Sequence, residues 1–284
     1  MKLSKRWLIF LLLPVATAFA ATPQAYKYLE KLVAPYVPTN QPTVEAMLRI
    51  ANVGADDYVI DLGSGDGRIL ITAAKKHGAR GFGVELDPQL LKESQENAKM
   101  EGVSSRVQFY QRDLLETRLG EASVITLYLL PEINLKLRPR LLRELRPGTR
   151  IVAHDFDLGE WKPDIRANVR GTGSQIFFWV VPARVAGKWD LRLEQTSGEP
   201  YEVELKQTFQ EIEGAASRAG RPFYLRDASL EGDRIAFVLI EDGDYMLQWR
   251  FEGRVNGNVI EGTMRGQAKA PRTRHKWRAT RVAS

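Results

Sequence analysis

The sequence predicts an α/β domain followed by a small all-β domain, and three observations support this division. Apolar runs alternate with helical patterns from about residue 58 to residue 181, which is typical of a parallel sheet with right-handed crossovers. A glycine-rich turn, Asp61-Leu62-Gly63-Ser64-Gly65-Asp66-Gly67-Arg68, separates the first apolar run from a helical pattern. After about Pro182 the helical periodicity disappears, and short alternating strands recur about every 8–12 residues.

Glycine and proline signals divide the α/β pattern into its elements. Pro88 opens a helix, and Gly78 and Gly102 follow the ends of two helices. The run over residues 122–129 is almost wholly apolar, which is typical of a strand buried on both faces. Residues 159–173 are too polar and too rich in glycine to predict a helix. The expected strands are residues 58–62, 80–86, 107–110, 122–129, 150–156 and 175–181, and the expected helices are residues 44–51, 67–77, 88–101 and 134–145.

The second domain is expected to be a small antiparallel β-barrel or sandwich of about 100 residues. Gly232-Asp233 and Asn256-Gly257 are strong signals for two-residue hairpin turns. A barrel mouth could hold a ligand, but a packed accessory domain that positions its neighbour or a partner is at least as good an interpretation. The expected strands are residues 188–194, 201–209, 211–217, 223–230, 234–240, 245–255, 258–264 and 275–282.

Composition excludes several classes of site. The chain has 284 residues, of which 44% are hydrophobic and 27% charged, so it has room for two modest domains. Cysteine is absent, which excludes disulfides, thiolate metal sites and cysteine nucleophiles. The three histidines, His77, His154 and His275, lie far apart in the sequence, so we predict no metal site.

The formal net charge is +6, and much of it lies in a basic C-terminal tail. No acidic residue follows Glu261. Such a tail could bind nucleic acid or anionic lipid, although a solvated surface strand is the favoured interpretation because only Trp277 offers a ring for base stacking. The basic residues of this tail are Arg265, Lys269, Arg272, Arg274, Lys276, Arg278 and Arg281.

Residues 1–21 have the pattern of a targeting segment. Lys2, Lys5 and Arg6 precede an apolar run, and Ala18-Phe19-Ala20 fits a signal-peptidase cleavage site. The apolar run is shorter than the roughly 20 residues of a membrane-spanning helix. We therefore expect an exported or periplasmic protein, or one attached to a membrane by an uncleaved N-terminal segment.

The glycine-rich turn says most about function. Its glycines let the backbone approach a ligand closely, because no Cβ stands in the way. Dinucleotide sites follow GxGxxG, whereas Gly63, Gly65 and Gly67 follow GxGxG, with an arginine at the third dinucleotide position. The carboxylates of Asp61 and Asp66 would repel a pyrophosphate but suit a cationic amino-acid ligand such as S-adenosylmethionine.

At this point the chain resembles the class I S-adenosylmethionine-dependent methyltransferases, whose first motif is a GxGxG loop of this kind. Glu85 lies at the end of the second expected strand, and Asp113 follows the third. The resemblance implies a Rossmann-like seven-stranded methyltransferase sheet whose last strands form an antiparallel edge. It also implies that S-adenosylmethionine places its ribose on Glu85, its adenine amino group on Asp113 and its methionine part on Asp61, Gly63, Gly65 and Gly67.

A longer set of motifs is similar to the protein-lysine methyltransferases related to the ATP synthase c-subunit lysine methyltransferase. These motifs are Tyr36-Val37-Pro38-Thr39, residues 61–68, residues 126–132 and His154-Asp155-Phe156-Asp157. The similarity covers about residues 36–183 and leaves out the β domain. Asn40 replaces the proline that often follows the first motif, and Ser64 stands where the group often has cysteine. We therefore divide the chain into residues 1–21, a methyltransferase domain over residues 22–183 and an accessory domain over residues 184–284.

The resemblance implies methyl transfer to a protein lysine, and a small membrane protein is one candidate substrate. The acceptor site should follow the fourth strand, so Tyr128 and Glu132 are the candidate catalytic residues. His154 could line the acceptor pocket, although a hydrogen-bonded strand residue is slightly favoured. The [N/D]PP[Y/F] motif of nucleobase methyltransferases is absent from this position, so we expect no nucleic-acid partner.

Two alternatives to lysine methylation stay open at this point. One is methyl transfer to a small molecule. The other is an exported, non-catalytic module that binds a nucleoside or nothing and acts through its β domain. The second alternative accounts for the conflict between an export signal and a methyl donor that is made in the cytosol.

Overall fold

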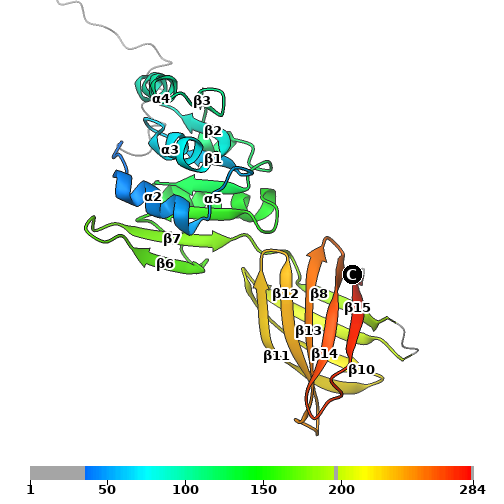
Figure 1. Cartoon of the computed structure of the whole chain (residues 1–284). Coiled ribbons are helices and arrows are strands. Elements are labelled where there is room, and N and C mark those ends of the chain that lie inside the picture. Colours follow the sequence, from blue (N-terminus) through cyan, green and yellow to red (C-terminus); the bar gives the residue numbers. More distant parts are fainter. Residues whose placement is uncertain (1–35, 195–197, 283–284) are drawn as a thin grey trace, which may run out of the picture.

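The computed structural model describes residues 36–194 and 198–282, which form two units (Figure 1). The first is a seven-stranded sheet with helices on both faces, and the second is a closed antiparallel barrel. The fold class predicted from the sequence is confirmed, and the structure decides for a barrel over a sandwich.

The sheet has the strand order β3-β2-β1-β4-β5-β7-β6. β1 to β5 run parallel, whereas β7 is antiparallel to both β5 and β6. The strands are β1 (Tyr58–Leu62), β2 (Arg80–Glu85), β3 (Val107–Gln111), β4 (Val124–Leu127), β5 (Arg150–His154), β6 (Ile165–Asn168) and β7 (Gln175–Val180), and the helices are α2 (Gln41–Ile50), α3 (Arg68–His77), α4 (Pro88–Met100), η1 (Leu114–Glu116) and α5 (Pro131–Glu144).

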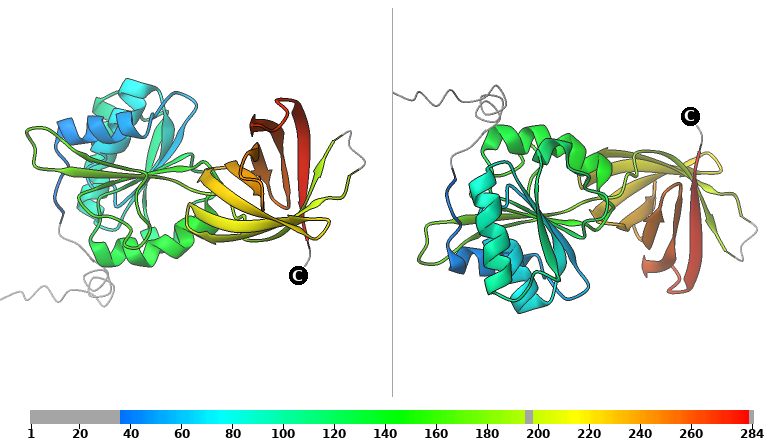
Figure 2. Two further views of the ribbon diagram at one scale, coloured as in Figure 1. Left: turned by 90° about the horizontal axis from the view of Figure 1, so that it is seen from below. Right: turned by 90° about the horizontal axis from the view of Figure 1, so that it is seen from above.

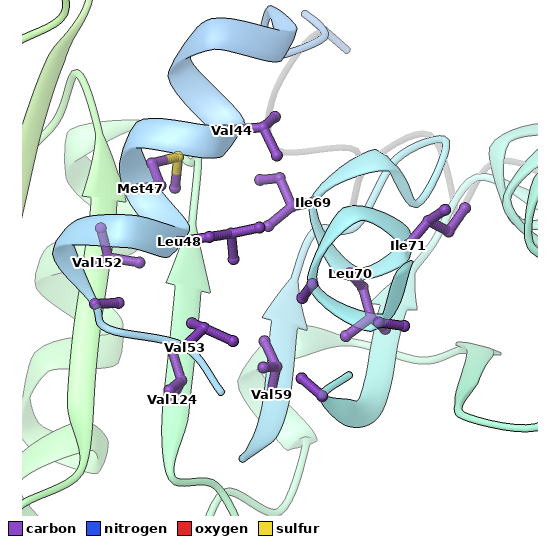
Figure 3. Packing of buried hydrophobic residues seen from close by; sticks show 14 of the residues in the cluster. Val44, Met47, Leu48, Val53, Val59, Ile69, Leu70, Ile71, Val124 and Val152 are labelled. Atoms are coloured by element: carbon purple, nitrogen blue, oxygen red, sulfur yellow. The ribbon is translucent and has the colours of Figure 1, made fainter. Parts of the chain in front are cut away.

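The sheet carries a separate apolar layer on each face, because successive side chains of a strand point to opposite sides. Val59 of β1 packs with α2 and α3 on one face, and its neighbour Ile60 packs with α5 on the other. Figure 3 shows the first layer, where Met47 and Leu48 of α2 lie near the strand residue Val152. Figure 2 shows α5 on the face opposite α2 and α3.

The antiparallel edge contains the element that sequence reasoning missed. β6 has mostly exposed side chains, so it shows no apolar pattern. β6 forms a strand because it pairs with the buried strand β7, although its own sequence does not predict one. The predicted antiparallel edge is therefore present, with its first strand inside residues 159–173.

The barrel is an up-and-down meander that closes where its first strand meets its last. Tyr201, Phe237, Phe251 and Trp277 meet in its interior, with ring centroids of Phe237 and Phe251 5.1 Å apart. This aromatic packing favours a packed accessory domain over a barrel that holds a ligand. The strands are β8 (Gly187–Leu193), β9 (Tyr201–Thr208), β10 (Glu211–Arg218), β11 (Arg221–Glu231), β12 (Arg234–Glu241), β13 (Leu247–Asn256), β14 (Val259–Ala268) and β15 (Arg274–Arg281).

The two units pack through a seam at the amino-terminal edge of the parallel strands. Val180, at the end of β7, pairs with Arg150 at the start of β5, so the chain leaves the sheet at that edge. Trp161 stacks on Phe209 of the β9–β10 turn at 5.9 Å and donates a hydrogen bond to Gln210 at 2.8 Å. The barrel is thus joined to the edge opposite the glycine-rich turn.

The expected targeting segment, residues 1–21, lies outside the described residues. Among the helices that the structure describes, none is both long and apolar enough to cross a membrane.

Gly83 of β2 gives the glycine-rich turn its close contact with the sheet. A Cβ on Gly83 would lie 2.6 Å from Ser64 Oγ and 2.7 Å from a ring carbon of Phe109. We expect Gly83→Ala to destabilise the fold by about 1–3 kcal/mol through overpacking. Urea unfolding measures this change. The matched control is Gly54→Ala, because nothing lies within 4 Å of a Cβ there, and equal effects of the two substitutions would contradict the packing argument.

Candidate functional site

The glycine-rich turn joins the carboxyl end of β1 to the start of α3. Gly63, Gly65 and Gly67 all have positive φ, at 80°, 53° and 83°, which glycine adopts without the strain of a side chain. The backbone N–H groups of Gly63 and Ser64 donate to Val84 O of β2 at 3.0 and 2.9 Å. These bonds hold the turn against the end of the neighbouring strand.

Asp61 is a carboxylate buried at the point where the sheet changes direction. Its side chain is 2% exposed, and Oδ1 accepts a 2.6 Å hydrogen bond from Thr126 Oγ1 on β4. Burial raises the pKa of Asp61 to about 7, and the nearby carboxylates of Glu85 and Asp66 add to this shift. The strand order reverses between β1 and β4, which is where open α/β sheets bind their ligands.

Glu85 brings a second carboxylate to the same turn from the end of β2. Its Oε2 accepts from Gly65 N at 2.9 Å, and its Oε1 accepts from the backbone N–H groups of Leu86 and Asp87. Because each carboxylate oxygen has two lone pairs, Oε2 can accept a further hydrogen bond from a ligand hydroxyl. Asp113 follows β3 and accepts from Leu115 N at 2.8 Å as the cap of η1.

A strap formed by Tyr36 and Thr39 crosses the glycine-rich turn. The Tyr36 ring covers Gly65 so closely that a Cβ there would lie 2.5 Å from it. Arg68 donates to Thr39 O at 2.9 Å and forms an ion pair with Asp66. The sequence alone gave the strap no role, because the residues that it contacts are distant along the chain.

A second cluster lies beside the turn, at the ends of β4 and β5. His154 is buried and hydrogen-bonds Thr39 Oγ1 through Nδ1 at 3.1 Å and Ser174 Oγ through Nε2 at 2.9 Å. Burial lowers the pKa of His154, so the ring is neutral near pH 7. The Tyr128 ring packs on it, with centroids 3.9 Å apart. His154 is therefore a hydrogen-bonded strand residue that also supports Tyr128.

Asp155 brings a carboxylate to this cluster through an unusual backbone. Its φ is 60°, and Phe156 N donates to His154 O at 2.7 Å across it, which closes a γ-turn. Strained backbone of this kind is often found at functional sites. Asp155 Oδ2 lies 3.3 Å from His154 Nε2, and burial together with the charge of Asp155 raises the pKa of Tyr128.

The structure brings most of the predicted site residues together around the glycine-rich turn and the Tyr128 cluster. Glu132 lies at the edge of this group. Glu132 is exposed in the first turn of α5, and within the described chain its side chain has no hydrogen bond or ion pair. The carboxylate next to Tyr128 is instead that of Asp155. The sequence alone gave Asp155 no role beyond its place in the motif that begins at His154.

Two buried polar atoms of the turn have no hydrogen-bond partner among the described residues, namely Asp61 Oδ2 and Ser64 Oγ. Such atoms are costly unless a ligand or water satisfies them. The three glycines meanwhile let the turn pack closely against Leu129, Tyr36 and Phe109. The donor set fits S-adenosylmethionine, which carries an ammonium, a sulfonium and a ribose.

Comparison with known proteins gives consistent similarities over the sheet unit. Residues 61–165 match the family described as the ANTKMT methyltransferase domain. The chain is 44% identical over 130 residues to a protein-lysine N-methyltransferase of Saccharolobus islandicus, covering 45% of this chain and 81% of that protein. It is 36% identical over 159 residues to the human lysine N-methyltransferase of the ATP synthase c-subunit, covering 56% of this chain and 66% of that protein.

One solved structure is similar over nearly its whole length. It is described as an RNA methyltransferase from Salinibacter ruber in complex with S-adenosyl-L-homocysteine. The identity is 50% with a TM-score of 0.51, and the match covers 52% of this chain and 96% of the other. The family match ends at residue 165, before the barrel begins.

The raised pKa of Asp61 predicts a specific dependence of stability on pH. Between the unfolded pKa near 4 and the folded pKa of about 7, the folded chain holds a proton that the unfolded chain releases. This contribution to stability is therefore full below about pH 4 and is lost as the pH rises to 7. We expect Asp61→Asn, which cannot ionise, to flatten the decline of melting temperature between pH 4 and 7. Parallel melting curves for the two proteins would contradict the assignment.

Proposed function

The chain belongs to the protein-lysine N-methyltransferase family, and from this premise we propose that it methylates the ε-amino group of a lysine in a protein, using S-adenosylmethionine. The observation that carries the proposal is the pair of unsatisfied buried atoms, Asp61 Oδ2 and Ser64 Oγ, in a glycine turn beside the Tyr128–His154 cluster. The turn and the cluster lie at neighbouring strand ends, as a donor site and an acceptor site must.

In this proposal the turn binds the donor. Asp61 and the turn of Gly63, Gly65 and Gly67 face its cationic methionine part. Glu85 accepts from the ribose hydroxyls, and Asp113 accepts from the adenine amino group. Bound S-adenosylmethionine supplies a methyl group made electrophilic by its sulfonium. A cation beside Asp61 would also favour the ionised carboxylate, which burial alone disfavours.

The Tyr128 cluster would position the acceptor. A lysine amine must lose its proton before it can attack, and its ordinary pKa is near 10.4. Because the pKa of Tyr128 is raised, its phenol stays protonated and can accept an N–H bond without adding charge. The Phe156 ring, 6.5 Å from the Tyr128 ring, contributes an apolar wall that favours the neutral amine. Glu132 would lie at the rim, where it could attract the lysine side chain.

The partner and the location are part of the same proposal. A protein substrate agrees with the names of the relatives, and residues 1–21 would export the chain or attach it to a membrane near a small membrane protein. Because the similar Salinibacter protein is described as an RNA methyltransferase, RNA is the competing acceptor, and any test must include it. A small-molecule acceptor is not favoured.

Donor binding is the first test. Calorimetric titration of the protein with S-adenosylmethionine and S-adenosylhomocysteine should give micromolar affinity. Glu85→Ala should weaken both by about 10-fold to 100-fold, because it removes charge-assisted hydrogen bonds to the ribose. Glu116→Ala, an exposed acid near Asp113, is the control. If the Glu85 variant and the unchanged protein bind the two ligands with equal affinity, the assignment of the donor site is wrong.

Acceptor chemistry is tested with donor carrying a tritiated methyl group. Protein and RNA from cells that express the chain are offered separately, and the labelled product is hydrolysed to its amino acids or nucleosides. At a donor concentration near the Kd of the unchanged protein, we expect label in methyl-lysine with the unchanged protein and much less with Glu85→Ala. Label in a nucleoside would replace lysine by RNA as the acceptor.

Removing the Tyr128 hydroxyl should slow methyl transfer without changing the affinity for the donor. We expect Tyr128→Phe to lower kcat for methyl transfer by about 10-fold to 100-fold, the effect of one lost hydrogen bond in the acceptor pocket, with unchanged donor affinity. Tyr110→Phe is the control, because Tyr110 is exposed on β3. A matching loss in both variants would mean that Tyr128 has no special role.

A further inference from the structure

The outer wall of the barrel carries a row of arginines on neighbouring strands. Arg250 of β13 lies directly opposite Arg265 of β14, which in turn lies opposite Arg274 of β15. Val238 of β12 continues the row between Arg250 and Arg226 of β11. Like charges directly opposite each other on adjacent strands, about 5 Å apart, destabilise a sheet. We call these four arginines the arginine row.

The arginine row is only partly neutralised within the described chain. Glu252 accepts from Arg250 Nε at 2.7 Å, and this bond, with the charges of Arg250, Arg265 and Arg274, lowers the pKa of Glu252. Among the described residues, Arg226, Arg265 and Arg274 have no ion-pair partner, and Asp227 follows Arg226 in a bulge. Other arginines of the wall are paired, namely Arg192 with Asp190, Arg254 with Asp233 and Arg278 with Glu261.

An exposed tip with three large apolar side chains adjoins the arginine row at the end of the barrel away from the sheet, and it also carries the exposed carboxylate of Asp244. Tyr224 is two residues before Arg226 on the same outward face of β11, and its ring stacks on Tyr245 at 6.3 Å. Tyr224, Tyr245 and Met246 are 43%, 63% and 44% exposed. The tip also contains Asp242, which raises the pKa of Tyr224. The opposite end of the barrel, at Gly232, packs on Gly148 of the sheet unit.

We propose that this wall docks on an anionic lipid bilayer, with the arginine row on lipid phosphates and the tip at the headgroup level. Anionic phosphates would relieve the repulsion within the row, and tyrosine and methionine suit a membrane interface where one side is apolar and the other wet. Because the tip is distant from the seam, docking leaves the glycine-rich turn uncovered.

Two features favour a bilayer over single-stranded nucleic acid. Nucleic-acid strands are bound in basic grooves with aromatic rings between the charges. Here the arginine row lies on the convex outside of a closed barrel, and the residue within the row is Val238. The two exposed tyrosines stack on each other at the end of the row. This proposal does not depend on methyl transfer, so it can fail while the proposed function stands.

The test uses the full chain, in which any introduced cysteine is unique because the sequence has none. An environment-sensitive dye is placed at the tip by Met246→Cys. The control dye is placed by Glu204→Cys on β9, the strand opposite β13 in the barrel. Both are titrated with vesicles of phosphatidylcholine alone and of equimolar phosphatidylcholine and phosphatidylglycerol. We expect a blue shift only at position 246 and only with anionic vesicles.

The arginine row is tested by R226Q/R265Q/R274Q against R192Q/R254Q/R278Q, which removes the same charge from paired positions. The first triple variant should raise the anionic lipid concentration needed for the shift about a hundredfold, about fivefold for each arginine. The control should change it little. The first variant should also melt no lower than the unchanged protein, because it removes repulsion.

Three results would overturn the proposal. One is no shift at position 246 with anionic vesicles, and another is a shift that the first triple variant retains at the original lipid concentration. The third is binding to a single-stranded RNA oligonucleotide, lost in that variant, in the absence of vesicle binding. The shared N-terminal segment cannot produce the expected pattern, because it is identical in every variant.

Discussion

The buried carboxylate of Asp61 is the constraint on which the rest of the site depends. It lies between β1 and β4, where the strand order reverses, and only one of its oxygens has a partner among the described residues, Thr126. Protein interiors tolerate such a group only where something offsets its desolvation. The glycine turn, Glu85 and the neighbouring strand ends surround this position, so the sheet is built around a point that a cationic ligand would stabilise.

The strap connects the glycine-rich turn to the Tyr128 cluster. Thr39 accepts from Arg68 through its carbonyl and hydrogen-bonds His154 through its hydroxyl, so one residue contacts both the turn and the Tyr128 cluster. The neutral, buried His154 ring in turn supports Tyr128. Two hydrogen bonds of Thr39 therefore link the glycine-rich turn to the Tyr128 cluster.

The barrel has a different relation to the chemistry. It is joined at the amino-terminal edge of the strands through Trp161 and Phe209, while the proposed reaction belongs to the carboxyl edge. Its interior is filled with aromatic rings, and its distinctive features lie on its outside. A domain placed in this way can determine where the enzyme works while leaving the acceptor free to approach the catalytic edge.

By itself, the sequence determined the order of the elements and the donor motif, because apolar periodicity and glycine spacing are local signals. It predicted Asp61, Glu85 and Asp113 at strand ends, where the structure places them. Only the tertiary structure decided that β6 is a strand, that Asp155 rather than Glu132 adjoins Tyr128, and that Thr39 and Ser174 bond His154. It also aligned four arginines that are scattered along the sequence. These features depend on contacts between residues far apart in the chain, and no local pattern records such contacts.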